Sequence, residues 1–234
     1  MAFELIIATK ELQEAIKQDT ELLLTKVTPA LEQDPYDTPG PQTLKTGTLD
    51  FGYFGFVSAV ELITGDALAL DIGLSVGTAQ FSDAGWFKWA YNQKILFVAK
   101  KTFRHSISWD QIHAIGAVFG TKTVSIGGKT YKVRLLTGGN GQPASEGGGE
   151  WNMVMYGVHQ NYLPPWDYYN DQDLQTHNSY GNGSYSWCQE TSSANASGRV
   201  VRGDIGVSNF YTLTSSYAHT TPSGWRPVLE LVPN

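Results

Sequence analysis

The closing stretch of the chain, residues 224–231, constrains the fold more than any other part of the sequence. An apolar strand over Val228–Leu231 follows Pro227, and proline marks where ladder pairing begins because it has no N–H to donate. Arg226 stands just before this strand, and a buried guanidinium needs partners for several of its donors. We therefore predict that this strand pairs with one formed much earlier in the chain. We also predict that Arg226 is buried against carbonyls or a carboxylate.

The composition favours a β-rich domain with a polar but weakly charged surface. Charged residues make up only 16% of the 234 residues, whereas ordinary globular proteins carry roughly a quarter. Hydrophobic residues make up 41%, which is enough for a substantial core. The length allows one large domain or two small ones. The single cysteine, Cys188, excludes an intramolecular disulfide framework.

Charge is unevenly distributed along the chain. The net charge of −6 argues against a general nucleic-acid binder. Nine of the 16 lysines and arginines nevertheless lie in residues 86–140, while both flanking regions are acidic. This basic region is either a phosphate-binding patch or, more simply, a partner for the acidic flanks. We recognise no signal peptide and no membrane-spanning window, so we expect synthesis in a reducing cytoplasm.

The first 48 residues are predicted to form an arm. Thr9 is a candidate cap for an amphipathic helix that runs to about Leu31. Its apolar side consists of Leu12, Ile16, Leu23, Val27 and Leu31. Such a helix is too short to be stable alone, so it either packs on its own domain or joins copies of itself around an oligomer axis. Residues 33–49 hold three prolines and two glycines and are interpreted as a linker or an extended arm. We expect residues 1–48 to serve oligomerisation or anchoring, and residues 49–234 to form the folded domain.

Local patterns within residues 49–234 predict short helices and hairpins. A helix over 64–72 has Thr64 as its cap, and a helix over 108–119 begins with a capping box of Ser108 and Gln111. A further helix is predicted over 150–156. The predicted hairpins cover 86–99 and 123–136, and the other predicted strands cover 49–57, 184–189, 199–202 and 209–213.

Five short segments form a recognisable set: Asp83–Lys88, Leu96–Lys101, Arg104–Trp109, Glu150–Asn152 and Gly224–Leu229. Together they resemble a module of tailed-bacteriophage virion proteins, often described as tail or structural proteins, over roughly residues 49–232. Glu-Trp-Asn at 150–152 and Gly-Trp-Arg-Pro at 224–227 are also similar to the C-type-lectin-like fold shared with formylglycine-generating enzymes. The resemblance implies an α+β chain. An N-terminal helix and extended arm would precede a C-type-lectin-like domain with a mixed antiparallel sheet, two short helices and long loops.

The chain departs from the enzymatic and calcium-binding members of that fold. Formylglycine-generating enzymes need redox-active cysteines, and Cys188 stands alone, so that activity is not carried over. The Glu-Pro-Asn and Trp-Asn-Asp sequences of calcium-dependent lectins are absent. We therefore expect neither that chemistry nor a calcium-dependent sugar site.

Other candidate sites have simpler interpretations. The three aspartates within residues 167–173 lack the glycine and distal glutamate of a complete calcium loop, which favours a solvated acidic turn. His105, Ser106 and Asp110 lie close in sequence but without a nucleophile elbow. The cell-adhesion tripeptide at 202–204 is interpreted as a coincidence, and no metal-ligand spacing links the histidines. We expect no catalytic residue, no metal and no cofactor.

Aromatic residues are scattered among small polar ones from residue 164 to 223. This composition is typical of adaptable recognition loops, although the same side chains would also suit contacts between subunits. The candidate ligand-binding residues, expected to share one exposed face, are Trp166, Tyr168, Tyr169, Tyr180, Tyr185, Tyr211 and Tyr217. Structural roles are predicted for Trp109, Trp151, Trp225 and Arg226, with Trp225 packed near Trp151 or Trp109.

The sequence thus predicts a non-enzymatic structural component of a bacteriophage virion. The leading hypothesis places it at the tail or collar, in contact with the host surface through its aromatic loops. The alternative is a capsid-surface decoration protein whose arm docks on the shell. A cell-wall hydrolase is disfavoured because no convincing acid–base pair is found. Expected partners are other virion proteins, further copies of the chain (a trimer is compatible) and a host glycan or surface protein. We expect no nucleic acid and no membrane insertion, and localisation in the virion after assembly in the host cytoplasm.

Overall fold

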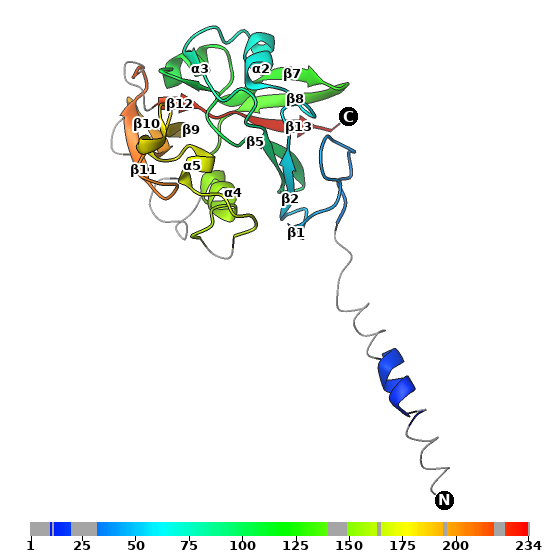
Figure 1. The fold of residues 1–234 in the computed structure, drawn as a ribbon. Coiled ribbons are helices and arrows are strands. Elements are labelled where there is room, and N and C mark those ends of the chain that lie inside the picture. Colours follow the sequence, from blue (N-terminus) through cyan, green and yellow to red (C-terminus); the bar gives the residue numbers. More distant parts are fainter. Residues whose placement is uncertain are drawn as a thin grey trace, which may run out of the picture. The chain divides into compact units, whose positions relative to one another are not determined.

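The computed structural model describes residues 10, 12–19, 32–139, 149–162, 165–193, 196–217 and 223–233 (Figure 1). The chain divides into two compact units, residues 1–32 and residues 33–234. In the first unit, residues 12–19 are helical, and the side chains of Leu12 and Ile16 are 61% and 57% exposed. The predicted N-terminal helix is confirmed over this stretch, and the rest of it lies outside the described residues.

The second unit is built on two sheets. Within the described ranges, the larger sheet has seven antiparallel strands in the order β1-β2-β4-β5-β13-β8-β7. These strands are β1 (Thr46–Gly47), β2 (Phe51–Val57), β4 (Trp86–Tyr91), β5 (Lys94–Ala99), β7 (Phe119–Ile126), β8 (Lys129–Arg134) and β13 (Val228–Val232). The predicted closing strand is β13, which pairs with β5 on one side and β8 on the other. Strand β13 therefore lies inside the sheet, and both predicted hairpins are confirmed as β4–β5 and β7–β8.

The smaller sheet is mixed. Among the described residues it has six strands in the order β11-β10-β9-β12-β6-β3, and only the β12–β9 pair is parallel. These strands are β3 (Thr78–Ala79), β6 (Arg104–His105), β9 (Tyr185–Thr191), β10 (Gly198–Gly203), β11 (Phe210–Thr214) and β12 (Ser223–Trp225). The two sheets are covalently linked at β12 and β13, because Arg226 and Pro227 are all that separates these strands.

Several short helices cover the sheets: α2 (Gly65–Ile72), α3 (Trp109–Ala114), α4 (Glu150–Gly157), α5 (Asp171–Leu174) and the 3-10 helix η1 (Asn178–Tyr180). The predicted caps are present, because Thr64 accepts from the N–H of Ala67 and Ser108 forms a capping box with Gln111. Helix α3 ends at Ala114 and not at the predicted residue 119. The chain turns after α3, and Phe119 begins β7 instead.

The central strands of the larger sheet are buried on both faces. On one face, Trp86, Ile95 and Phe97 join α2 and α3 in a first hydrophobic cluster. On the other face, Trp89 and Leu96 join α4 in a second cluster. In Figure 1, α2 and α3 accordingly lie on the opposite side of β5 and β13 from α4. The central strands β4 and β5 must therefore be apolar at almost every position.

The interpretation of residues 33–49 as a linker is wrong. Within the second unit, the buried side chains of Asp34 and Lys88 form an ion pair at 2.9 Å. The Lys88 ammonium also donates to the carbonyl of Pro41 at 2.7 Å, and Leu44 is 1% exposed. The boundary between the units thus falls after residue 32 rather than at residue 48, because a long-range buried charge pair fixes this segment on the sheet. The fold class is α+β, with one antiparallel sheet, one mixed sheet and several short helices.

Candidate functional site

Arg226 joins the two sheets and one helix. Its side chain is 1% exposed and donates to the carbonyls of Ala99, at 3.0 Å, and Lys100 at the end of β5. It also donates to the carbonyl of Leu174 in α5 at 2.5 Å and to the hydroxyl of Ser186 in β9 at 3.0 Å. The prediction that Arg226 is buried against carbonyls is therefore confirmed.

The three tryptophans predicted to be structural are all buried. The indole N–H groups of Trp109 and Trp151 each donate to a backbone carbonyl at 2.9 Å. Trp225 belongs to the same hydrophobic cluster as Trp109, and its ring centroid lies 6.5 Å from that of Phe103. The guanidinium of Arg226, rather than Trp225, lies over the ring of Trp151, at 5.6 Å.

Of the seven aromatic residues predicted to form one surface, five fall into two groups. Trp166 and Tyr169 pack on the second cluster, where their ring centroids lie 4.5 Å from Phe51 and 5.0 Å from Phe87. Burial raises the pKa of Tyr169 to about 12, and the neighbouring carboxylates of residues 167 and 173 add to this shift.

The second group lies on the smaller sheet. Tyr185 in β9 and Tyr211 in β11 stack with ring centroids 6.1 Å apart, and Tyr217 packs with Tyr185 against the first cluster. Tyr168 and Tyr180 are 75% and 43% exposed. The described packing therefore places five of the seven residues in two separate groups and does not support one continuous recognition face.

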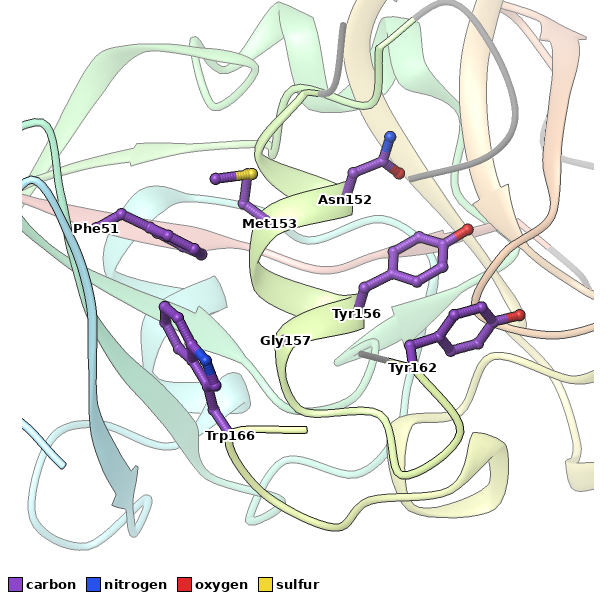
Figure 2. Close-up of a pocket in the computed structure, with 7 residues that line it drawn as sticks. All are labelled: Phe51, Asn152, Met153, Tyr156, Gly157, Tyr162 and Trp166. Carbon is purple, nitrogen blue, oxygen red and sulfur yellow. The ribbon is translucent and has the colours of Figure 1, made fainter. Parts of the chain in front are cut away.

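One member of the predicted set, Trp166, lines an open apolar pocket. The pocket encloses about 190 Å³. Its lining residues, drawn in Figure 2, are Phe51, Asn152, Met153, Tyr156, Gly157, Tyr162 and Trp166, and we refer to this site as the aromatic pocket. Phe51 and Trp166 lie on one side of α4, and Tyr156 and Tyr162 lie on the other (Figure 2). The tyrosine rings meet edge to face, with centroids 4.5 Å apart.

Helix α4, which forms the floor of the aromatic pocket, is fixed by side chains at its first turn. The Glu150 carboxylate accepts two hydrogen bonds from the Arg134 guanidinium, at 2.6 and 2.7 Å. The amide oxygen of Asn152 accepts from the Arg202 guanidinium at 2.7 Å. At the other end of α4, a side chain at Gly157 would collide with Trp89, whose ring would lie 2.9 Å from an added Cβ. Glycine at this position therefore lets the helix lie directly on the core.

The loop that follows α4 is also held in place. The N–H of Trp166 donates to the carbonyl of Gly157 at 2.5 Å, and the N–H of Tyr162 donates to the carbonyl of His159 at 3.0 Å. The ring of Trp166 packs on Phe51 and, at 5.2 Å, on the buried Trp89. The walls of the pocket are thus positioned by backbone hydrogen bonds and ring contacts before any ligand arrives.

Sequence reasoning missed Phe51, Met153, Tyr156 and Tyr162 as site residues. Met153, Tyr156 and Gly157 stand at positions i, i+3 and i+4, which places them on adjacent parts of the α4 surface. That spacing could have identified part of the pocket floor from the sequence alone. Phe51 is about a hundred residues away in β2, and no local pattern connects it to α4.

Asp171 anchors the same loop from the other end. Its Oδ1 accepts from the N–H of Val207 at 2.7 Å and from the hydroxyl of Thr176 at 2.6 Å, and it lies 3.4 Å from Nε2 of His159. The N–H of Asn161 donates to Nδ1 of His159, and the opposite ring nitrogen, Nε2, faces Asp171. Burial alone would raise the pKa of Asp171, but the hydrogen bonds from His159, Thr176 and Val207 lower it to about 2.

This shift predicts a specific loss of stability in acid. Because the folded-state pKa of Asp171 lies below its ordinary value of 3.8, its contribution is fully present above pH 3.8 and is lost as the pH falls towards 2. Urea unfolding of the wild type should show this loss, and Asp171→Asn should be less stable near neutral pH with a flatter pH dependence below pH 4. Parallel curves for the two proteins over that range would contradict this role of Asp171.

The remaining candidate sites do not form. Arg202 of the adhesion tripeptide is fully buried, and its guanidinium also donates to the carbonyl of Gly138 at 3.1 Å, so the tripeptide is not presented to a receptor. The hydroxyl of Ser106 contacts Nδ1 of His105 at 2.9 Å, but the carboxylate of Asp110 accepts from Ser215 instead. These residues therefore do not form a catalytic triad.

The aspartates at 167, 171 and 173 have separate partners. Asp167 accepts from the hydroxyl of Tyr53 at 3.2 Å, whereas Asp173 accepts from the N–H of Asn170 and so caps α5. In the part of the chain that the structure describes, no three His, Cys, Asp or Glu side chains are arranged to hold a metal ion.

Comparison with known proteins yields no relatives. No family model, no curated protein and no solved structure gives a significant match to this chain. Of the helices that the structure describes, none has the length and the apolar character needed to span a membrane.

Proposed function

We propose that this chain is a non-enzymatic structural component of a bacteriophage virion, associated with the tail or collar, with a C-type-lectin-like domain. The first observation that supports this proposal concerns the segments that resemble virion proteins. Their tryptophans Trp86, Trp109, Trp151 and Trp225 are all buried, and Arg226 joins the two sheets. The residues that carry the resemblance are thus the ones on which the fold depends. Tyr36, near the start of the second unit, and Leu231 of β13 line a common pocket, which fits a domain whose ends are brought together.

The observation that carries a recognition role is the aromatic pocket. Its walls are held in place by backbone hydrogen bonds and ring packing, so binding costs little conformational entropy. The nearby carboxylates of Asp167 and Asp171 are engaged by Tyr53, Lys45, Thr176 and Val207. This arrangement favours binding without chemistry, and we infer that the ligand is a host glycan or host surface protein.

The N-terminal unit supports an attachment role. Its described helix exposes Leu12 and Ile16, an i and i+4 pair that forms an apolar stripe. Such a stripe suits contacts with other virion proteins or with further copies of the chain. The same observation favours the second candidate function, a capsid-surface decoration protein whose N-terminal unit docks on the shell.

Removal of residues 1–32 tests the attachment role. We expect residues 33–234 to fold, because this unit contains both hydrophobic clusters and the Asp34–Lys88 ion pair. We also expect the truncated protein to be absent from purified particles, as judged by immunoblotting. The paired change Leu12→Glu with Ile16→Glu in the full chain is the matched variant and should have the same effect. Normal incorporation of both proteins would contradict the proposed role of this unit.

A further inference from the structure

In the part of the chain that the structure describes, the two sheets have four edge strands, and three of them carry features that discourage further pairing. Edge strands β1 and β3 are only two residues long. Edge strand β7 has an irregular register between Phe119 and Lys122, and Lys122 gives it a charge. Short strands, bulges and lysines are the ordinary means by which proteins keep a sheet edge from pairing with another chain. The fourth edge strand, β11, has none of these features.

Strand β11 is the outer strand of the smaller sheet at the end opposite β3 (Figure 1). Its five residues, Phe-Tyr-Thr-Leu-Thr, pair with β10 in an unbroken register, and each of them is half-buried or exposed. Aromatic residues and threonine favour strands, and residues 205–225 contain no Asp, Glu, Lys or Arg. This edge is therefore well suited to strand pairing and carries no charge that would prevent it.

The hydrogen bonds between β10 and the chain around β11 show which way the backbone groups of β11 face. The N–H of Gly203 donates to the carbonyl of Asn209, just before β11, and hydrogen-bonded pairs recur at every second residue of an antiparallel ladder. The backbone groups of Tyr211 and Leu213 are therefore directed at β10. Ser215 continues this alternation, because its N–H also donates across the ladder, at 2.8 Å.

The backbone groups of Phe210, Thr212 and Thr214 consequently point away from the sheet. Within the described ranges, no hydrogen bond engages the outward N–H or C=O of Phe210 or Thr212. The carbonyl of Thr214 accepts from the N–H of Tyr217 in the following turn, at 2.9 Å. A row of unpaired backbone groups along a sheet edge is a template for one more strand.

We propose that β11 pairs antiparallel with β11 of a second copy of the chain, about a two-fold axis through Thr212. This contact goes beyond the proposed function and does not depend on it. The register brings Thr212 opposite Thr212 and Phe210 opposite Thr214, which are favourable threonine and aromatic–β-branched pairs. Tyr211 lies opposite Leu213, so an aromatic ring meets an aliphatic side chain. The register uses all five residues, and the residues that face each other with hydrogen bonds are those whose backbone groups point outwards.

A second copy fits this edge better than a strand from another protein. A single added strand would itself present a new unpaired edge, whereas a two-fold contact uses the same surface of both copies and leaves neither β11 edge open. Two five-residue strands make a small interface, below the roughly 1,200 Å² of stable complexes, so we expect a Kd on the order of 100 μM.

Sedimentation velocity on the full-length chain, from about 10 μM to about 1 mM, tests the proposal around the expected Kd. Thr212→Lys places two lysines opposite each other at the axis, and Thr212→Glu places two glutamates there. Each variant alone should raise the Kd at least about tenfold because like charges directly opposite repel. An equimolar mixture of the two variants should restore association, since a lysine then faces a glutamate. Association through the N-terminal unit is common to all these proteins and cancels in the comparison.

Thr123→Lys is the matched control. It makes the same change at an exposed position of β7, the edge that already carries Lys122, and should leave the Kd unchanged. Hydrogen exchange supplies a local readout: the N–H of Thr212 should exchange more slowly as the protein concentration rises, whereas that of Tyr211, already in the ladder, should not change. Thermal unfolding of each variant verifies the fold. The proposal is overturned if Thr212→Lys associates as the wild type does, if the mixture does not restore association, or if exchange at Thr212 is independent of concentration.

Discussion

Replacement of Arg226 by alanine is expected to lower the free energy of unfolding by about 3–5 kcal/mol. The side chain is fully enclosed and its described partners are the carbonyls of residues 99, 100 and 174 and the hydroxyl of Ser186. These partners belong to the larger sheet, helix α5 and the smaller sheet. Without the guanidinium, the two sheets lose a shared anchor, and several buried acceptors lose their donor at once. Urea denaturation followed by tryptophan fluorescence measures this loss.

Two matched variants test whether the loss of stability comes from the buried donors of Arg226. Arg226→Lys keeps the charge but not the planar fork of donors, so it should recover only part of the lost stability. Arg104→Ala removes an arginine that also donates to two carbonyls, those of Val76 and Gly77, but at the surface. Its cost should be about 1 kcal/mol. Equal costs for Arg104→Ala and Arg226→Ala would mean that the junction between the sheets does not depend on Arg226.

Lys88→Met is expected to cost a similar amount, about 3–5 kcal/mol, because it leaves a buried carboxylate without its partner. The side chains of Lys88 and Asp34 are both 0% exposed, and the ammonium also bonds the carbonyls of Thr38 and Pro41. The loss should be accompanied by release of residues 33–44 from the sheet, which limited proteolysis and hydrogen exchange would detect.

The double variant Asp34→Asn with Lys88→Met is the key comparison. It removes both charges, so it should be more stable than Lys88→Met alone, as the replacement of whole buried ion pairs often is. Lys45→Ala breaks an ion pair with Asp167 in which the lysine side chain is 54% exposed, and it should cost less than about 1 kcal/mol. A loss for Lys88→Met no larger than that for Lys45→Ala would contradict the buried role of the pair.

The stability that Asp34 contributes should decrease in acid. Burial alone would raise the pKa of Asp34, but hydrogen bonds from Thr38, Lys88 and the backbone of Tyr36 outweigh it and lower the pKa. Asp34 therefore stabilises the fold above its ordinary pKa of 3.8, and this contribution is lost as the pH falls below that value.

Several elements could be predicted because their signals are local. The helix caps at Thr64 and Ser108 depend only on neighbouring residues, and both are present in the structure. The turn at Asn92 and Gln93 requires two residues with positive φ, which the structure has at 49° and 61°. The closing strand β13 was predicted because Pro227 and the apolar run after it identify a strand start without further context.

Other parts could not be predicted because they depend on long-range contacts. Residues 33–48 have the composition of a linker, and only the distant Lys88 shows why they are ordered. Strands β3, β6 and β12 are two or three residues long, too short for any alternating pattern to be recognised. The aromatic pocket combines β2 and α4 with Tyr162 and Trp166, and its apolar walls form only when these parts of the chain meet.

Electron microscopy of purified particles tests the virion assignment most directly. Under the proposal, the phage that would encode the chain is grown with an affinity tag after residue 234, and its particles are labelled with gold. We predict label at the tail or collar of every particle. Label spread over the shell would instead support the decoration alternative. Purified particles that carry no label, while the tagged protein remains in the lysate, would contradict the assignment to the virion.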